Sequence, residues 1–360
     1  MKKTLVALAA LAATSAFAQS TVTISGVLDV GVRNTSKVAA GLSKLGVTAG
    51  NNNRVSFAVV EDMGGGLKAT ANAEMRFDPT TGTPEAGGAR PLFQGQTRVG
   101  LVGGFGTVML GRGLTPLQAA NGGNSDPWGV TTAAGSVYAA GFATDYAAGG
   151  EGRIDQGIWY TSPTFGGLTL AASVSPRKLV TAGVASKTSQ SMTAAYANGP
   201  LMVGVGNERN RANDTISQVF GNYNLGVAKL FASHATIKGG TAAEQALGGA
   251  FAAGAAAVNT GAAPTQVAAG GKIKNWTVGA TVPMGATTIR LGYSGWNGNG
   301  AVGQKDDTKV GLGVKYDLSK RTFIYSDIAQ QTRKNFTSTA ALGRDNTTVQ
   351  LFDLGIAHSF

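Results

Sequence analysis

The sequence contains no cysteine, so it can form neither a disulfide framework nor a thiolate metal site. Charged residues make up only 14% of the 360 residues, against about 25% in an ordinary soluble domain. Beyond the N-terminal segment, no run reaches the roughly 20 apolar residues that a membrane-spanning helix needs. The Ala- and Gly-rich stretch 246–258 comes closest, but it is short and is interrupted by Asn259 and Pro264. These absences argue against a disulfide scaffold and a helical membrane protein.

Glycine, by contrast, is abundant. The chain has 54 glycines, about 15% of its residues against a usual share of about 7%. Hydrophobic residues make up 43% and are spread along the whole chain. Moderate hydrophobicity without a helical span is typical of membrane strands that have one apolar face and one polar face.

The first eighteen residues have the pattern of an export signal. Lys2 and Lys3 precede the apolar run 4–17, and Ala16-Phe17-Ala18 forms a small-x-small cleavage site. We therefore expect residues 1–18 to be removed and residues 19–360 to form the mature domain. The formal charge would fall from +11 to +9, because both lysines leave with the signal.

Apolar and polar residues alternate with a period of two through most of the mature chain. Residues 67–77 show it most clearly, since the odd positions from Leu67 to Phe77 are apolar and the even positions from Lys68 to Arg76 are polar or charged. A helix has a period of 3.6 and would mix these two faces. The pattern predicts strands with one face toward an apolar phase and one toward water.

Short and long connections between the predicted strands alternate along the chain. Seven short ones contain or adjoin turn-forming residues, and eight long ones lie between them, which predicts sixteen strands. The short connections are 61–66, 103–106, 162–167, 198–200, 224–226, 283–286 and 317–320, and the long ones are 34–53, 78–92, 113–152, 176–189, 208–216, 237–272, 297–307 and 333–348.

This arrangement predicts an all-β fold, a 16-stranded antiparallel transmembrane barrel with short periplasmic turns and long extracellular loops. Closure pairs every backbone group, and sixteen strands leave an aqueous lumen. A water-soluble sandwich would need far fewer long loops, and no blade-length repeat indicates a propeller.

Several segments, in the same order and spacing, resemble the trimeric general porins of Gram-negative bacteria, particularly the betaproteobacterial and neisserial type. The resemblance runs the length of the mature chain and implies an outer-membrane homotrimer through which small hydrophilic solutes diffuse passively. The segments are 22–32, Asn53-Arg54-Val55-Ser56-Phe57, 61–69, Gln96-Thr97-Arg98-Val99-Gly100-Leu101, 104–112, 196–201, 318–322 and Gly355-Ile356-Ala357-His358-Ser359-Phe360.

The resemblance also implies where the pore is narrowest. In this family the third loop folds inward and constricts the lumen, and its counterpart here is 113–152, with Asp126 in the segment Asp126-Pro127-Trp128-Gly129. An ordinary exposed loop is the alternative. The conformation of loop 237–272, rich in Ala and Gly, is left open.

Four arginines are the candidate basic side of this constriction. Strand parity places Arg54, Arg76, Arg98 and Arg153 on lumen faces, and the resemblance supports all but Arg76. Arginine stays charged, and its planar fork binds carboxylate or phosphate at two points. Alternatively, these arginines are structural and pair with Glu74, Asp155 or Asp353.

The basic excess predicts a preference for anions. Arg290, Lys309 and Lys315 also fall on lumen faces by parity, and a basic funnel raises the local anion concentration. The alternative is that the charge lies on outer loops or faces lipopolysaccharide phosphates.

We expect no enzyme activity, no cofactor and no nucleic-acid partner. The only histidines, His234 and His358, have no nucleophile–base motif around them, although Ser233 adjoins His234. The expected partners are outer-membrane lipid and lipopolysaccharide, permeating solutes, and the assembly machinery through the C-terminal strand ending in Phe360. A substrate-specific channel and a plugged structural or adhesive barrel remain as alternative functions.

Overall fold

The computed structural model describes most of the mature chain, and the predicted signal segment 1–18 lies outside the described residues. The described residues are 20–36, 44–50, 53–85, 91–129, 134–135, 152–176, 180–181, 184–185, 187–248, 252–253, 265–267, 269–297, 306–334 and 347–360.

The chain folds into a closed antiparallel barrel of sixteen wall strands, which confirms the predicted fold class. Each strand pairs with the next along the chain, and β22 pairs with β1 to close the wall. The wall strands are β1 (Thr21–Thr35), β3 (Arg54–Gly64), β4 (Leu67–Asp78), β6 (Gln96–Gly103), β7 (Gly106–Leu114), β8 (Arg153–Thr161), β9 (Leu168–Ser175), β12 (Ser189–Asn198), β13 (Leu201–Arg209), β14 (Thr215–Asn224), β15 (Lys229–Lys238), β18 (Lys272–Met284), β19 (Thr287–Asn297), β20 (Asp306–Asp317), β21 (Thr322–Lys334) and β22 (Thr347–Ser359).

The remaining elements are short and belong to the long connections. They are β2 (Leu45–Ala49), β5 (Thr83–Pro84), α2 (Pro116–Asn121), β10 (Val180–Thr181), β11 (Val184–Ala185), α3 (Ala242–Gly248), β16 (Ala252–Ala253) and β17 (Thr265–Gln266). None of the helices among the described residues is long and apolar enough to cross a membrane.

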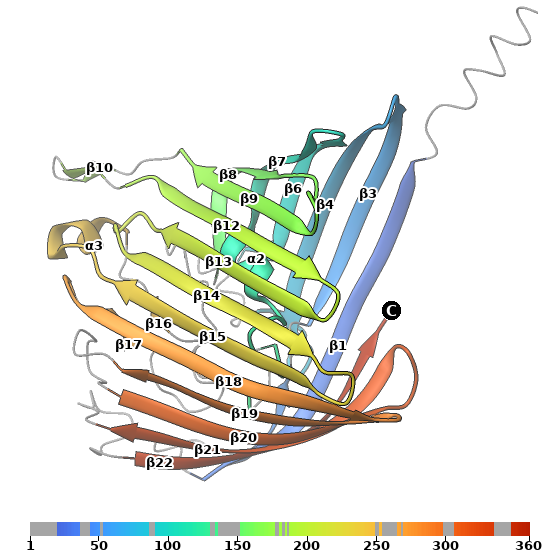
Figure 1. Cartoon of the computed structure of the whole chain (residues 1–360), viewed down its shortest axis with the longest axis vertical. Coiled ribbons are helices and arrows are strands. Elements are labelled where there is room, and N and C mark those ends of the chain that lie inside the picture. The colour runs from blue at the N-terminus through green and yellow to red at the C-terminus, as the bar shows by residue number, and fades with distance from the viewer. Residues whose placement is uncertain are drawn as a thin grey trace, which may run out of the picture.

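All tight turns lie at one end of the barrel, called the turn end, and the long connections lie at the other, called the loop end (Figure 1). The C-terminus lies at the turn end, where Gly26 N–H donates to the Phe360 carbonyl (3.0 Å) and Phe360 N–H donates back to Gly26 (3.1 Å). The last residue therefore completes the seam between the first and last strands.

The second wall strand is interrupted. β2 pairs with the loop-end half of β1 and β3 with the other half. Between them, the buried Asn53 side chain accepts from Asp29 N–H (2.5 Å) and donates to the Asp29 carbonyl (3.0 Å). The asparagine amide thus replaces the backbone pairing that the break removes, as buried backbone groups require.

The two faces of each strand meet different surroundings. On β15, Phe231, Ser233 and Ala235 are buried inside the barrel, whereas Leu230 and His234 between them are exposed on the outside. A strand points successive side chains to opposite faces, so the predicted alternation places one set in the lumen and the other on the outer wall.

Candidate functional site

The connection that follows β7 enters the barrel. Thr115 caps α2 by accepting a hydrogen bond from Gln118 N–H (3.2 Å), and Pro116 opens the helix. Leu117 is fully buried on the inner faces of β12 and β13: its N–H donates to Ser191 Oγ (3.2 Å), and a Cβ atom at Gly206 would lie 2.6 Å from its side chain. It belongs to one apolar cluster that continues along the inner faces of β14 to β19. The members of that cluster are Leu117, Ile216, Phe220, Ala235, Ile237, Val267, Ile273 and Trp296. The described part of the predicted third loop is thus folded inward.

After α2 the loop crosses to the inner faces of β18, β19 and β20. Glycines make room for it there: a Cβ atom at Gly279 would lie 2.5 Å from Pro127, and one at Gly292 would lie 2.6 Å from the Trp128 ring. The Trp128 indole N–H donates to Asp327 Oδ1 (2.7 Å). Close approach to two glycines and one buried hydrogen bond hold the loop against the wall.

Further along, the Lys309 ammonium donates to the Gly135 carbonyl (2.7 Å). We call the inner faces of β18 to β22 and β1 the docking wall. Its cations are Arg33, Arg290, Lys309 and Lys315, and its buried acids are Asp29, Asp307, Asp327 and Asp353. The sequence analysis had not proposed a role for Arg33, although the alternation in β1 puts it on the polar face.

Acids and cations are matched within the docking wall. Arg33 pairs with Asp353 (3.0 Å), and both side chains are nearly inaccessible. Tyr325 donates to Asp29 (2.8 Å), and Lys315 pairs with Asp317 (2.8 Å). Asp353 had been considered as a partner for the candidate constriction arginines, but the structure pairs it with Arg33.

The inner faces of β3, β4, β6 and β8, which adjoin the docking wall where β3 pairs with β1, carry the four predicted arginines. Arg54 and Arg76 are direct neighbours across β3 and β4. Arg54 lies 3.7 Å from Glu74 and remains partly exposed, and Arg76 lies 3.3 Å from Glu85. The pair of Arg54 with Glu74 agrees with the alternative in which these arginines are structural. Even so, both arginines lie on the lumen faces of their strands.

Arg98 lies beside the open part of the lumen. It lines a cavity of about 450 Å³ between α2 and the wall, together with Trp159. Its guanidinium lies over the Trp159 ring, 5.4 Å from the centroid, and donates a hydrogen bond to the side-chain oxygen of Gln96. The Trp159 indole N–H is held by the Leu114 carbonyl (2.9 Å), so the ring that supports Arg98 is itself fixed in place.

Arg153 lies deeper in the same wall. Its Nε donates to the Gly95 carbonyl (2.5 Å), and the side chain is buried. Arg76 and Arg112 act electrostatically on it as like charges, and Glu74 acts as an opposite charge. The four predicted arginines thus lie on one side of the lumen, where like charges are close together.

Arg112 is a fifth arginine of this group, and it was missed by strand parity. It pairs with Asp155 and donates to the Gln94 carbonyl (2.9 Å). The β7–β8 register shifts between Gly111 and Gly113, and a bulge of this kind breaks the alternation on which parity depends. We call Arg54, Arg76, Arg98, Arg112 and Arg153 the arginine wall.

Asp126 lies in the described part of the inserted loop. It is only 3% exposed, and its Oδ1 accepts from Trp128 N–H (2.7 Å), as in an Asx turn. It acts electrostatically on Arg290 and Lys309 of the docking wall. Its role at the constriction stays a prediction, and the structure places it beside the cations of the docking wall.

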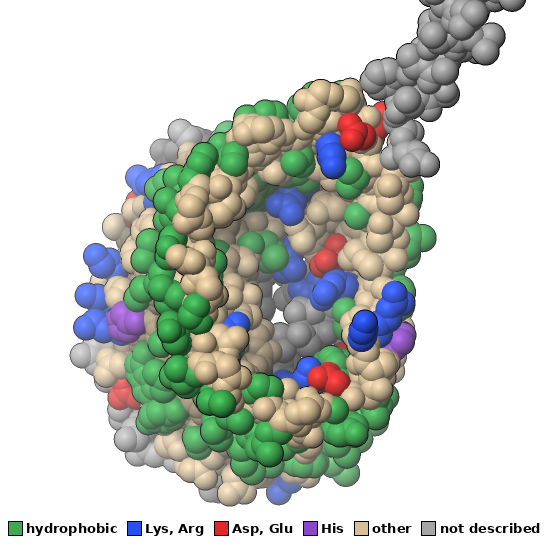
Figure 2. Space-filling model, turned by 45° about the vertical axis from the view of Figure 1, so that its right-hand side comes forward, with side chains coloured by type: hydrophobic (Ala, Val, Ile, Leu, Met, Phe, Trp, Pro, Cys, Tyr) green, Lys and Arg blue, Asp and Glu red, His purple; other side chains and the backbone are tan. Residues whose placement is uncertain are grey.

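Figure 2, with the turn end brought forward, shows a hollow interior with basic side chains gathered on its inner surface and an apolar outer wall. Among the described residues no group of acidic or histidine side chains is arranged to hold a metal ion. His234 and His358 are exposed on the outer surface. The expectation that the chain has no catalytic activity stays a prediction.

Comparison with known proteins was consistent across sequence and structure. The profile of the Gram-negative porin family matches residues 4–335. Outer membrane porin protein 32 of Delftia acidovorans is 31% identical, and the alignment covers all of both chains. Major outer membrane protein P.IB of Neisseria meningitidis serogroup A is 28% identical over 89% of this chain and 91% of its own. The structure of an anion-selective porin from Comamonas acidovorans superposes with a TM-score of 0.71, at 24% identity over 95% of this chain and all of the other.

Proposed function

Because the chain belongs to the Gram-negative porin family, we propose that its arginine wall makes it an anion-preferring pore. The protein is a β-barrel of the outer membrane through which small hydrophilic solutes and ions diffuse passively. Family and fold are those of a channel. The preference for anions is the part that the arginine wall supports.

One observation carries the proposal: charge is balanced on one side of the lumen and not on the other. The five arginines of the arginine wall face three nearby carboxylates, Glu74, Glu85 and Asp155. On the docking wall the buried acids are at least as numerous as the cations. The unbalanced positive charge therefore lies on the arginine wall, away from the described contacts that Trp128 and Gly135 of the inserted loop make with the docking wall.

The geometry suggests how an anion passes. An anion that loses part of its hydration at the narrow level meets guanidinium groups that remain charged at every physiological pH. Arg54 is the most exposed of the paired arginines, and Arg98 is fixed by Trp159 beside the cavity. Several neighbouring arginines offer a permeating anion several weak binding positions instead of one tight one. The anion therefore leaves each position quickly, as conduction requires.

We assign the constriction to Arg54, Arg76, Arg98 and Arg153, with Asp126 in the facing loop. Asp126 is expected to offset Arg290 and Lys309 rather than to contact the permeating ion. This assignment lines one side of the lumen with positive charge, which raises the local concentration of anions there.

The test is the reversal potential of single channels in a planar bilayer under a tenfold KCl gradient. The expected sign is that of chloride carrying most of the current. A potassium-selective sign would overturn the anion preference, and the absence of open-channel steps would instead favour a plugged structural barrel.

Further proposals concern assembly. The resemblance to trimeric porins supports a homotrimer, the terminal strand ending in Phe360 is proposed to be recognised by the assembly machinery, and residues 1–18 are proposed to be cleaved as a signal. Outer-membrane lipid and lipopolysaccharide are the proposed surroundings of the barrel. Native mass spectrometry of the purified protein would give both the mature mass and the number of subunits.

A further inference from the structure

A short hairpin extends the arginine wall at the loop end. β4 turns back at 79–82, where the Asp78 carboxylate accepts from Thr80 N–H (2.8 Å), and β5 returns beside it. Glu85 follows β5, and its N–H donates to the Arg76 carbonyl (3.1 Å). Side chains that lie opposite each other across antiparallel strands share one face of the sheet. The hairpin therefore brings the Glu85 side chain to the lumen face that carries Arg76.

Two side chains hold the Glu85 carboxylate at this position. One of its oxygens lies 3.3 Å from the Arg76 guanidinium, and the other accepts a hydrogen bond from the side-chain amide of Gln94. Gln94 is buried, and its carbonyl accepts from the Arg112 guanidinium (2.9 Å). Glu85 is therefore fixed against the arginine wall through contacts with β4 and with the residues that precede β6. We call Arg76 and Glu85 the hairpin pair.

In the hairpin pair the acid is more exposed than the cation. The Arg76 side chain is 11% exposed and the Glu85 side chain 29%. The neighbouring pair has the opposite order, because the Arg54 side chain is 35% exposed and the Glu74 side chain only 15%. An ion in the lumen therefore reaches Arg54 before its partner, but it reaches Glu85 before Arg76.

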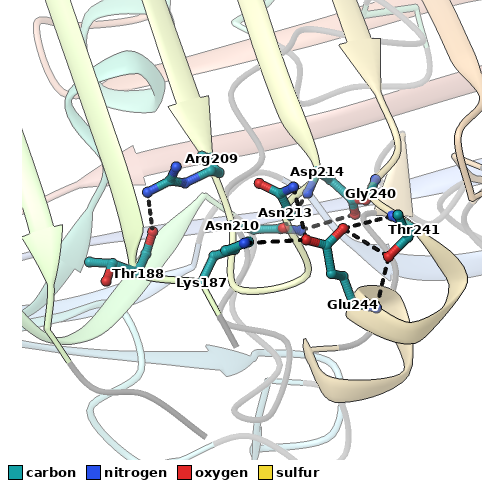
Figure 3. Close-up of polar contacts among 9 residues, drawn as sticks. All are labelled: Lys187, Thr188, Arg209, Asn210, Asn213, Asp214, Gly240, Thr241 and Glu244. Atoms are coloured by element: carbon teal, nitrogen blue, oxygen red, sulfur yellow. Dashed lines mark hydrogen bonds and ion pairs between the residues drawn. The ribbon is translucent and has the colours of Figure 1, made fainter. Parts of the chain in front are cut away.

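Other ion pairs of the barrel show both orders. In the loop-end cluster of Figure 3, Lys187 lies 3.5 Å from Glu244, and the lysine is the more exposed partner. Arg112 and Asp155 have the order of the hairpin pair, with a smaller difference. Asp155 belongs to the wall strand β8, whereas Glu85 comes from the second long connection. Glu85 is thus an acid that a loop adds to the surface of the arginine wall.

The position of Glu85 changes what Arg76 can contribute to the electric field in the pore. Opposite charges 3.3 Å apart form a dipole, and the field of a dipole weakens with distance faster than that of a single charge. Arg76 therefore attracts a distant anion only weakly. Close to the wall, an anion that approaches Arg76 meets the exposed carboxylate first and is repelled by it.

We propose that Glu85 is a selectivity-determining residue of the pore: its tethered carboxylate occupies the position beside Arg76 that a permeating anion would otherwise take. The inference rests on the proposed function and deepens it, because it divides the arginine wall into two parts. Arg54 and Arg98 act on the permeating anion, and Arg76 is neutralised by the chain itself. Glu85 lowers the anion preference of the pore below the value that the arginines alone would give.

The experiment measures the chloride-to-potassium permeability ratio of E85Q in a planar bilayer, from single-channel reversal potentials in a KCl gradient. Removing one negative charge from the lumen face is expected to raise the ratio about twofold, since the local concentration of anions follows the charge of the wall. The matched control is E61Q. Glu61 is exposed and lies opposite Ala69, whose other neighbour Leu101 is exposed on the outer wall. E61Q should leave the ratio nearly unchanged, because its charge is outside the lumen.

Two further variants separate the charge of Glu85 from a structural role. E85D keeps the charge on a shorter side chain and should retain a ratio close to that of the wild type. R76Q/E85Q replaces the hairpin pair by two neutral residues and should also stay close to the wild type, because the sum of the two charges is unchanged. If E85D raised the ratio as much as E85Q does, displacement of the hairpin would be the cause, and the proposal would be overturned.

The pH dependence of the ratio gives a test that a purely structural role would not pass. At about pH 3 carboxyl groups are largely protonated, so the difference in ratio between the wild type and E85Q should be far smaller than at neutral pH. The other described charged groups around Glu85 are present in both proteins, so the difference reports Glu85. Those groups are Arg54 of β3, Glu74, Arg76 and Asp78 of β4, Arg112 of β7, and Arg153 and Asp155 of β8.

A ratio in E85Q that equals or falls below that of the wild type would overturn the proposal, and so would a difference that persists undiminished at about pH 3. Failure of the proposed function gives a different result. A potassium-selective wild type would contradict the anion preference, yet E85Q should still shift the ratio toward chloride. Single-channel recording observes only folded and inserted molecules, so a lower yield of a variant does not alter its measured ratio.

Discussion

The arginine wall and the docking wall consist of strands with the same alternation of apolar and polar residues, yet they differ in how their charged side chains are paired and covered. On the docking wall, Arg33 forms a buried ion pair with Asp353, and Trp128 of the inserted loop packs against the wall. On the arginine wall, cations outnumber their acidic neighbours, the Arg54 side chain stays partly exposed, and Arg98 lines a cavity. The comparison shows that the net charge of the chain does not tell where in the pore the electric field is strongest. The charges that an ion meets are those whose side chains are neither buried under the loop nor paired with an opposite charge.

The largest effect should come from removing charge on the arginine wall. R54Q/R98Q/R153Q is expected to lower the chloride-to-potassium permeability ratio by on the order of tenfold, because these arginines supply the unbalanced field. Reversal potentials in a KCl gradient measure the ratio. K44Q/K187Q/K320Q removes the same amount of charge at three exposed lysines outside the arginine wall and should leave the ratio nearly unchanged. An equal shift in both variants would show that net charge alone sets selectivity.

Replacing an arginine of the docking wall by glutamine should lower the stability of the barrel and leave the ion selectivity nearly unchanged. R33Q leaves Asp353 without its buried partner at 3.0 Å and is expected to cost about 3 kcal/mol in the free energy of unfolding. R54Q, which breaks the more open pair with Glu74, should cost less than about 1 kcal/mol. Urea unfolding in detergent compares the two. If R33Q changes selectivity more than R54Q does, the contrast between the walls is wrong.

A smaller effect is expected from the glycine under the loop. Gly292→Val places side-chain atoms where the Trp128 ring lies, which should cost about 1 to 3 kcal/mol and displace the loop from the docking wall. Single-channel conductance should rise because the lumen widens. Leu291→Val, on the outer face of the same strand, is the control, and a conductance that falls or stays constant in G292V would argue that the loop does not limit the channel.

The smallest effect lies outside both walls, at the helix in the sixth long loop. Glu244 accepts from Thr241 N–H (2.9 Å) in a capping box, and that hydrogen bond holds the pKa of the Glu244 carboxyl below its usual range. A lowered folded-state pKa gives a stabilisation that is full above the unfolded pKa and is lost as pH falls through the folded one. The protection factor of the Thr241 amide, which compares its hydrogen-exchange rate with the intrinsic rate at the same pH, should therefore fall on acidification. E244Q should show no such pH-dependent step.

Much of the fold was predictable because the period of two and the punctuation of the chain are local properties. The sixteen strands and the inward third loop were correctly predicted, the loop from the resemblance. Parity predicted lumen faces for Arg54, Arg76, Arg98 and Arg153, whose role at the constriction stays a prediction. These features need only the order of residues along each strand.

What escaped prediction depends on contacts between distant segments. Arg112 was missed because a register shift and the positive φ of Gln156 (51°) break the alternation beside it. The break in the second strand, bridged by Asn53, depends on a side chain that reaches Asp29 across the sheet. The burial of Asp126 follows from how Trp128 docks on Gly292 and Asp327, which no local pattern encodes.

The most direct test of the central claim uses the absence of cysteine. Thr70→Cys introduces a single thiol into the cavity that Arg98 also lines, and its rate of reaction with negatively and positively charged thiosulfonates reports the local ion concentrations. The arginine wall predicts faster modification by the anionic reagent at low salt, with the difference shrinking in 1 M KCl, where the screening length falls to about 3 Å. Equal rates for the two reagents at low salt, or a faster cationic reaction, would contradict the account.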